Sequence, residues 1–109
     1  MNMRRVILES PFADDRRSNV AYARLCVRDS LNRGEAPLAS HLLYTQVLED
    51  DDVDERQLGI DAGHVWMAGA EAVIAYVDRG ITKGMILGLE RAKSRGLPVE
   101  LRKIPDYIP

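Results

Sequence analysis

The 109-residue chain contains one cysteine, two histidines and no surplus of positive charge. Cys26 has no second cysteine to pair with inside the chain, so a small buried core position is its simplest role. Lys and Arg number 15 against 17 Asp and Glu, which gives a net charge of −2. Proteins that follow a nucleic-acid backbone carry a basic excess, so nucleic acid is not an expected partner.

Long apolar runs are also missing. The start, MNMRRVIL, has too short an apolar run for a signal peptide, and nothing approaches the ~18 apolar residues of a membrane span. No membrane partner and a cytoplasmic location are therefore expected. With 46% hydrophobic and 29% charged residues, the composition is that of a globular protein. We expect one domain over 1–109, with a core of about 4–102 and an extended tail over 103–109.

Metal and dinucleotide motifs are absent as well. His41 and His64 lie far apart and have no cysteine pair nearby, which excludes the usual zinc spacing. The acidic run over 49–55 lacks the residue order of a calcium loop, so a solvated loop is the better interpretation. No G-x-G-x-x-G follows the first apolar run. No metal and no cofactor are expected.

Short apolar runs alternate with helical periodicity along the chain. A continuous apolar run that ends at a turn residue is typical of a buried parallel strand. The order β-α-β-α-β-α-β predicts an α/β fold of the Rossmann or flavodoxin-like kind, with about four parallel strands and helices on both faces. Strands are expected at 4–10, 36–41, 70–78 and 97–103, and helices at 18–34, after the 49–52 loop, and at 82–96.

The second predicted helix has a clear start and an apolar stripe. Asp52 followed by Glu55 resembles a capping box. The stripe is expected to face the core, with Trp66 buried; it comprises Leu58, Ala62, Val65 and Trp66.

Polar residues follow three of the predicted strands. In parallel sheets ligands bind beyond the carboxyl ends of the strands, so these residues are expected to meet at one rim. The first strand ends in Glu9, Ser10, Pro11 and Phe12, the second leads to Ser40, His41 and Tyr44, and the third leads to Asp78, Arg79 and Gly80.

Each of these residues also has an ordinary structural interpretation. Asp78 is either a turn or cap residue or an acid/base group in the crevice. His41 is either a hydrogen-bonded structural histidine or a catalytic one. Glu9 ends a strand that should be buried, so its carboxylate either pairs with an arginine or has a pKa raised by desolvation.

The helix that begins after Asp78 offers a possible anion site. Gly80 and Thr82 place backbone amides at its start, and Lys83 is adjacent. Gly84 and Gly88 share one face of this helix, where each glycine costs ~1 kcal/mol relative to alanine. Tight helix packing, or close approach of a ligand to Gly84, would offset that cost.

Three stretches together resemble a known family: ILESPFADDRRSNVAYAR, APLASHLLYTQVLEDDD and DRGITKGMILGLERAKSRGLPVE. They are similar to uncharacterised phage and bacterial proteins related to the nucleoside 2-deoxyribosyltransferases, over roughly residues 4–102. The resemblance implies a Rossmann-like domain, a nucleoside or nucleotide ligand and a homodimer or larger homo-oligomer. Ser10-Pro11 matches the transferase turn near the nucleoside, and Asp78 matches an aspartate that contacts the base.

The resemblance breaks at the nucleophile. Six residues after the aspartate, the transferases carry a glutamate that attacks the anomeric carbon, but here the count reaches Gly84, or Ile86 when the Gly-Met pair is matched. Either Glu9 supplies the carboxylate from a new position, or the pocket keeps recognition without chemistry. Glu90 lies almost two turns beyond Gly84 and is discounted.

The leading prediction is therefore a protein that cleaves or transfers at an N-glycosidic bond. Its alternatives are a non-catalytic binder of a nucleotide or nucleotide signal, and an oligomer scaffold that uses the glycine face. The expected catalytic residues are Glu9 and Asp78, and the expected substrate-binding residues are Ser10, Pro11, Phe12, His41, Tyr44, Gly80, Thr82, Lys83 and Gly84.

Overall fold

Four strands form one parallel sheet in the computed structural model, which describes residues 2–109. The strands are β1 (Arg4–Glu9), β2 (Glu35–Leu38), β3 (Ala72–Tyr76) and β4 (Val99–Arg102). Their order in the sheet is β2-β1-β3-β4, and every neighbouring pair is parallel. The predicted α/β fold class and the four strands are confirmed.

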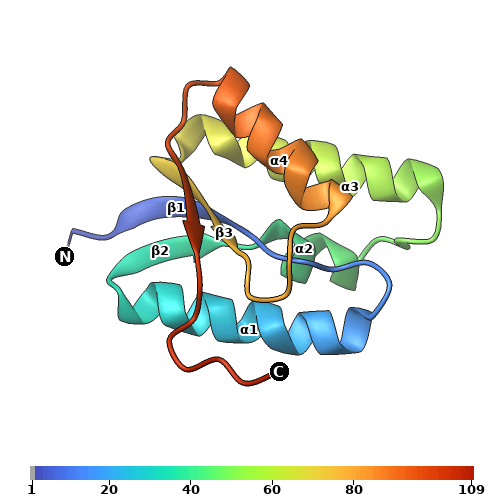
Figure 1. Cartoon of the computed structure of the whole chain (residues 1–109). Coiled ribbons are helices and arrows are strands. Elements are labelled where there is room, and N and C mark those ends of the chain that lie inside the picture. Colours follow the sequence, from blue (N-terminus) through green and yellow to red (C-terminus); the bar gives the residue numbers. More distant parts are fainter. Residues whose placement is uncertain (1) are drawn as a thin grey trace.

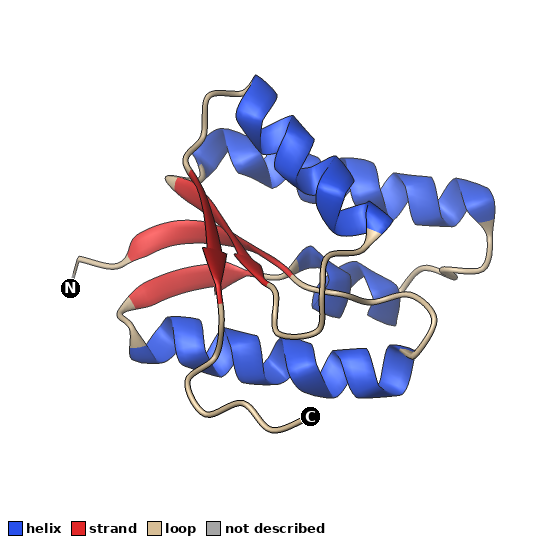
Figure 2. Cartoon of the chain, in the orientation of Figure 1, coloured by secondary structure: helices blue, strands red, loops and turns tan. Residues whose placement is uncertain are grey.

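Helices cover both faces of the sheet. The helices are α1 (Arg16–Asn32), α2 (Ser40–Leu43), α3 (Val53–Val65) and α4 (Lys83–Ser94), with 3-10 turns η1 (Tyr44–Gln46) and η2 (Trp66–Gly69). Helix α1 lies on one face together with the C-terminal tail, and α3 and α4 lie on the other (Figure 1). Figure 2 shows these two helical layers in blue around the red strands. Within the described residues, no helix is long and apolar enough to cross a lipid bilayer.

Alternation along β1 decides which way its last residue points. Val6 and Leu8 belong to the apolar cluster on the α1 face, which also contains the buried Cys26. Ile7 belongs to the opposite cluster, which contains Met67 and Ala92. Because side chains alternate along a strand, Glu9 points to the same face as Ile7, toward α4.

The direction in which successive strands are added to the sheet reverses at β1. From β1 the chain passes to β2 on one side, and β3 then pairs with β1 on the other side. In doubly wound sheets this arrangement opens a crevice beyond the carboxyl ends of the strands. The end of β1, at Glu9, therefore lies at the natural ligand position of the fold.

The predicted apolar face of α3 is wrong. Leu58, Val65 and Trp66 are 58%, 67% and 53% exposed, so this stripe faces outward and Trp66 is not a core residue. The indole Nε1 of Trp66 donates a hydrogen bond of 2.8 Å to the hydroxyl of Tyr44.

Helix α3 instead packs through its two glycines. A Cβ on Gly63 would lie 2.5 Å from Oγ of Ser40 in α2, and one on Gly59 would lie 3.3 Å from Leu48 Cδ1. The absence of side chains at these positions lets α2 approach closely. Hydrophobic periodicity therefore selected the face opposite to the one that packs inward.

Helix caps fix the loops around the cavity. Asp15 accepts from the backbone N–H of Ser18 at the start of α1. Asp52 accepts from the N–H groups of Asp54 and Glu55 at the start of α3, as predicted. The Glu55 carboxylate accepts from the Glu49 N–H instead of completing a capping box, so it ties down the acidic loop.

Candidate functional site

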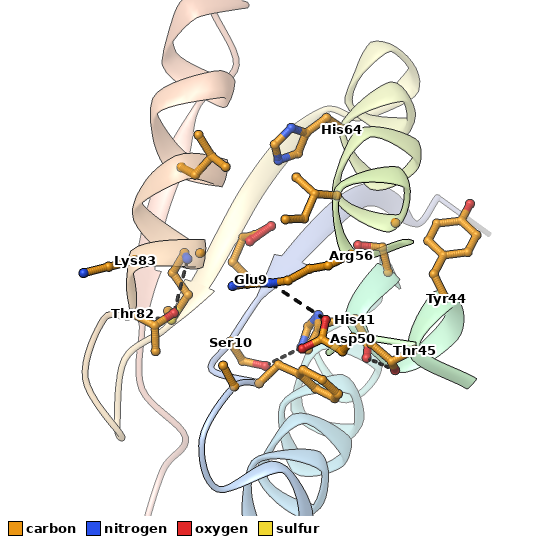
Figure 3. Close-up of a pocket in the computed structure, with 18 of the residues that line it drawn as sticks. Glu9, Ser10, His41, Tyr44, Thr45, Asp50, Arg56, His64, Thr82 and Lys83 are labelled. Atoms are coloured by element: carbon orange, nitrogen blue, oxygen red, sulfur yellow. Dashed lines mark hydrogen bonds and ion pairs between the residues drawn. The ribbon is translucent and has the colours of Figure 1, made fainter. Parts of the chain in front are cut away.

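A cavity of about 650 Å³ opens where β1 and β2 end. Its walls also include residues of α2, α3 and the first half of α4. This volume is within the ~300–1,000 Å³ range of small-molecule sites. Figure 3 shows side chains entering this space from several elements. The predicted residues that line it are Glu9, Ser10, Phe12, His41, Tyr44, Thr82, Lys83 and Gly84.

Glu9 brings a carboxyl group into this cavity and holds it against α4. A Cβ on Gly88 would lie 2.8 Å from the carboxyl carbon Cδ of Glu9 and 2.8 Å from Oε2. Gly88 therefore leaves the space that the carboxyl group fills. Burial raises the pKa of Glu9 from an ordinary 4.5 to about 7. Near neutral pH the group can both give and take a proton.

Ser10 and His41 form a second polar unit beside Glu9. Ser10 Oγ and His41 Nε2 share a hydrogen bond of 2.6 Å (Figure 3). Burial lowers the pKa of His41 to about 4, so its ring is neutral near pH 7. The structure differs from the predicted 36–41 strand, because β2 ends at Leu38 and His41 lies in the first turn of α2. That turn aims the imidazole back toward β1.

Helix α3 contributes residues that the sequence did not single out as site residues. Arg56, Ile60 and His64 follow each other at intervals of four and therefore share one helix face, which lines the cavity. Asp50 of the acidic loop also lines it and lies 3.9 Å from Arg56 Nε. The sequence signal for these residues was a stripe of mixed polarity with a period of four. The more apolar stripe on another face of α3 obscured it.

The start of α4 forms the remaining wall. The Thr82 hydroxyl accepts from the Met85 N–H at 3.2 Å and caps the helix. Gly84, in the first turn, is exposed and lines the cavity. A Cβ there would meet only Oγ1 of Thr82, at 3.9 Å. Unlike Gly88, Gly84 is not required by packing within the described residues.

Asp78 does not join this group of residues. It is not among the residues that line the cavity, and its carboxylate accepts from the Tyr22 hydroxyl at 2.6 Å and from the Ile104 N–H at 3.1 Å. Its place follows from alternation: Tyr76 faces α1, and Asp78, two residues later, is on the same side. Asp78 thus anchors the C-terminal tail to α1, which corrects the expectation that it shares a hollow with Glu9 and His41.

Pro11 and Gly80 also lie outside the cavity lining. Pro11 is buried. Gly80 has a φ of +89°, which favours glycine in the loop between β3 and α4. Both shape the backbone next to the site.

Removing the Asp78 carboxylate is expected to lower the stability of the fold. Asp78→Ala leaves the Tyr22 hydroxyl and the Ile104 N–H without their acceptor, so we expect a loss of about 2 kcal/mol or more in the free energy of unfolding. Urea unfolding measures this change. An unchanged free energy of unfolding would contradict the structural role of this carboxylate.

Ligands for a metal do not gather in the cavity. Among residues 2–109, no group of three or more His, Cys, Asp or Glu side chains is placed to hold a metal ion.

Comparisons with known proteins identify the fold but not an activity. Residues 4–102 match the model of a family described as Domain of unknown function (DUF7768). A comparison with curated proteins gives no match. The chain is similar to the solved structure of a 2-deoxyribosyltransferase from the psychrotolerant bacterium Bacillus psychrosaccharolyticus, with a TM-score of 0.63 and 17% identity over 96% of this chain and 76% of that chain. At this identity the similarity shows a shared fold alone.

Proposed function

Because the chain belongs to the DUF7768 family, whose description assigns no activity, we propose a function from its site. The protein acts at the N-glycosidic bond of a nucleoside or nucleotide, and Glu9 is the carboxylate at the reacting carbon. The observation that carries this proposal is the buried Glu9 carboxyl, with a pKa of about 7, against Gly88 in a cavity of ligand size. A fold shared with a 2-deoxyribosyltransferase supports it.

The chemistry requires one carboxylate close to the anomeric carbon. As the C–N bond breaks, its electron pair goes to the base nitrogen and positive charge develops on the sugar. The Glu9 carboxylate stabilises that charge or forms a C–O bond to the sugar. Water or an acceptor base then takes the sugar, which breaks any C–O bond to Glu9 and releases one proton, and the leaving base gains one proton.

Neighbouring groups supply the contacts that hold the ligand. His41, neutral and bonded to Ser10, contacts the sugar as donor or acceptor. The free amides at the start of α4, together with Lys83, suit a phosphate or the 5′ end of the sugar. Both positions line the cavity that contains Glu9.

The direct test is release of free base. Deoxynucleosides and their 5′-monophosphates are incubated with the protein, and the products are separated by chromatography, with Glu9→Gln as the matched control. The proposal expects base release from at least one compound by the wild type alone. No release from any of them, at protein levels where a transferase turns over, would contradict it.

A binder without catalysis is the second candidate. By the resemblance, Gly84, or Ile86 when the Gly-Met pair is matched, falls where the transferases carry their glutamate, and Asp78 is engaged by Tyr22 and Ile104. A site that lacks the nucleophilic glutamate and a free aspartate to contact the base, but keeps its cavity, would bind a nucleotide or nucleotide signal. Thermal stabilisation by a nucleotide without any turnover would favour this candidate.

Gly84→Ala is expected to separate stability from ligand binding. Alanine in the first turn of α4 should stabilise the fold by roughly 0.5–1 kcal/mol, because little lies within 4 Å of its Cβ. The same methyl group enters the cavity and should weaken nucleotide binding. Urea unfolding and calorimetry measure the two effects. Unchanged nucleotide affinity in a stabilised variant would show that the ligand does not approach Gly84.

We also propose that the protein is a homodimer that associates through the exposed stripe of α3. Leu58, Val65 and Trp66 form an apolar strip beside the cavity wall, to which Trp66 is joined through Tyr44. Val65→Glu should convert a dimer into a monomer in sedimentation velocity, because it introduces a charge into an apolar contact. A wild type that is monomeric at all concentrations would contradict this proposal.

A further inference from the structure

His64 lines the cavity with a buried ring nitrogen that has no hydrogen-bond partner. The residue is 9% exposed, and its Nδ1 has no partner among residues 2–109. Buried polar atoms in proteins are nearly always hydrogen-bonded, and leaving one unpaired is unfavourable. The other ring nitrogen, Nε2, is not among the buried unpaired atoms, so it is the nitrogen through which the ring can meet a ligand in the cavity.

The protonation state of His64 defines what it can bind. Burial lowers its pKa, Arg91 on α4 and Arg95 directly after that helix lower it further, and Asp61 opposes them. The ring is therefore neutral near pH 7 and presents one N–H donor and one acceptor nitrogen. It suits an uncharged partner that carries donors and acceptors, rather than a phosphate.

The cavity lining that accompanies His64 includes apolar side chains from two helices. Ile60 lies one turn before it on α3, and Leu87 and Met85 line the cavity from α4. Figure 3 shows His64 extending from α3 toward α4, beyond Glu9. An apolar slot with one hydrogen-bonding ring is typical of a site for a planar heteroaromatic group.

Position relative to Glu9 gives the slot a role in the reaction. Leu87 directly precedes Gly88, whose Cα carries no side chain where the Glu9 carboxyl lies. Ile60, Leu87 and Glu9 all line this one cavity, so a planar group between Ile60 and Leu87 shares the space that contains that carboxyl. The start of α4, at Thr82 and Lys83, forms another part of the wall.

We infer that Ile60, His64 and Leu87 form the subsite for the nucleobase, with the His64 ring hydrogen-bonded to the edge of the base. This inference rests on the proposed function. It orients the ligand: the base lies in the slot, the anomeric carbon lies at Glu9, and the 5′ end lies toward the start of α4. His64 is then the residue that reads the base.

Binding of free bases tests this assignment without requiring turnover. Adenine, guanine, cytosine, thymine and ribose 5-phosphate are titrated by calorimetry into the wild type, His64→Phe, His64→Gln and Glu9→Gln. We expect at least one base to bind the wild type and Glu9→Gln. The affinity should fall tenfold or more in His64→Phe and recover in part in His64→Gln, which keeps a donor and an acceptor. Binding of ribose 5-phosphate should not change.

Controls make each outcome decisive. His64→Phe should unfold at or above the wild-type temperature, because an unpaired polar atom is replaced by a ring of similar shape. Equal base affinity in His64→Phe and wild type would overturn the inference, and continued base release by the wild type would leave the role of Glu9 intact. If no base binds and no nucleoside or nucleotide is cleaved, the proposed function fails together with the inference.

Discussion

Glu9→Gln is expected to reduce base release by about 10³-fold or more, since it removes the charge that acts on the developing oxocarbenium ion. Glutamine has nearly the same shape and keeps the contact with α4 at Gly88, so the fold should be preserved. Single-turnover measurements with the best substrate give the size of the loss. A variant that retains most of the wild-type rate would remove Glu9 from the mechanism.

The same substitution should raise stability at neutral and higher pH. The folded protein holds the Glu9 proton up to a pKa of about 7, against 4.5 for the ordinary group, so stability falls as pH rises through this window. By pH 8 the buried charge should cost about 3 kcal/mol, which Glu9→Gln recovers. Wild type and variant should be equally stable near pH 4.5.

His41 should produce the opposite dependence on pH. Its folded pKa of about 4 lies below the ordinary 6.5, so stability falls as pH drops from 6.5 toward 4. In the wild type the Glu9 and His41 contributions oppose each other between pH 4.5 and 6.5. Urea unfolding of Glu9→Gln should therefore reveal a free energy that rises with pH across this window. A difference from wild type that does not vary with pH would show that Glu9 is not desolvated.

Gly88→Ala is expected to inactivate the protein without unfolding it. Its Cβ would lie 2.8 Å from Glu9 Cδ, so the carboxyl group must move away from its present position. A displacement of about 1 Å at a reacting group can cost about 10²-fold in rate. The helical gain of alanine over glycine, ~1 kcal/mol, offsets part of the strain, and urea unfolding should show only a small change.

A Glu9→Ala background distinguishes displacement of the Glu9 carboxyl group from a general destabilisation of α4. In Glu9→Ala the space next to residue 88 is empty, and Gly88→Ala should then stabilise the fold by ~1 kcal/mol. This coupling between positions 9 and 88 is measured by a double-mutant cycle. If Gly88→Ala destabilises both backgrounds equally, the glycine serves the helix and not the carboxyl group.

Much of this architecture could be predicted from the sequence because apolar runs and turn residues determine strands and turns locally. The continuous run before Glu9 and the run before Asp78 are β1 and β3 of the structure. The general rule for parallel sheets then placed Glu9, Ser10 and His41 at one rim, where the structure also has them. Local pattern and a topological rule were sufficient for this part of the site.

Other parts depend on which side of the sheet each strand end faces once the strands have paired. Glu9 pairs with Ala75 in the sheet, so both face α4, whereas Asp78 lies on the same side as Tyr76, which faces α1. The inward face of α3 was missed because two glycines made the packed side look less apolar than the exposed one. His64 and Arg56 belong to the face that hydrophobic periodicity passed over.

The most direct measurement is a carbon-13 NMR titration of the Glu9 carboxyl group in the folded wild type. A carboxyl that lies against Gly88 in a desolvated cavity should titrate with a pKa of about 7. A midpoint near the ordinary 4.5 would place Glu9 in water and contradict the site proposed for this protein.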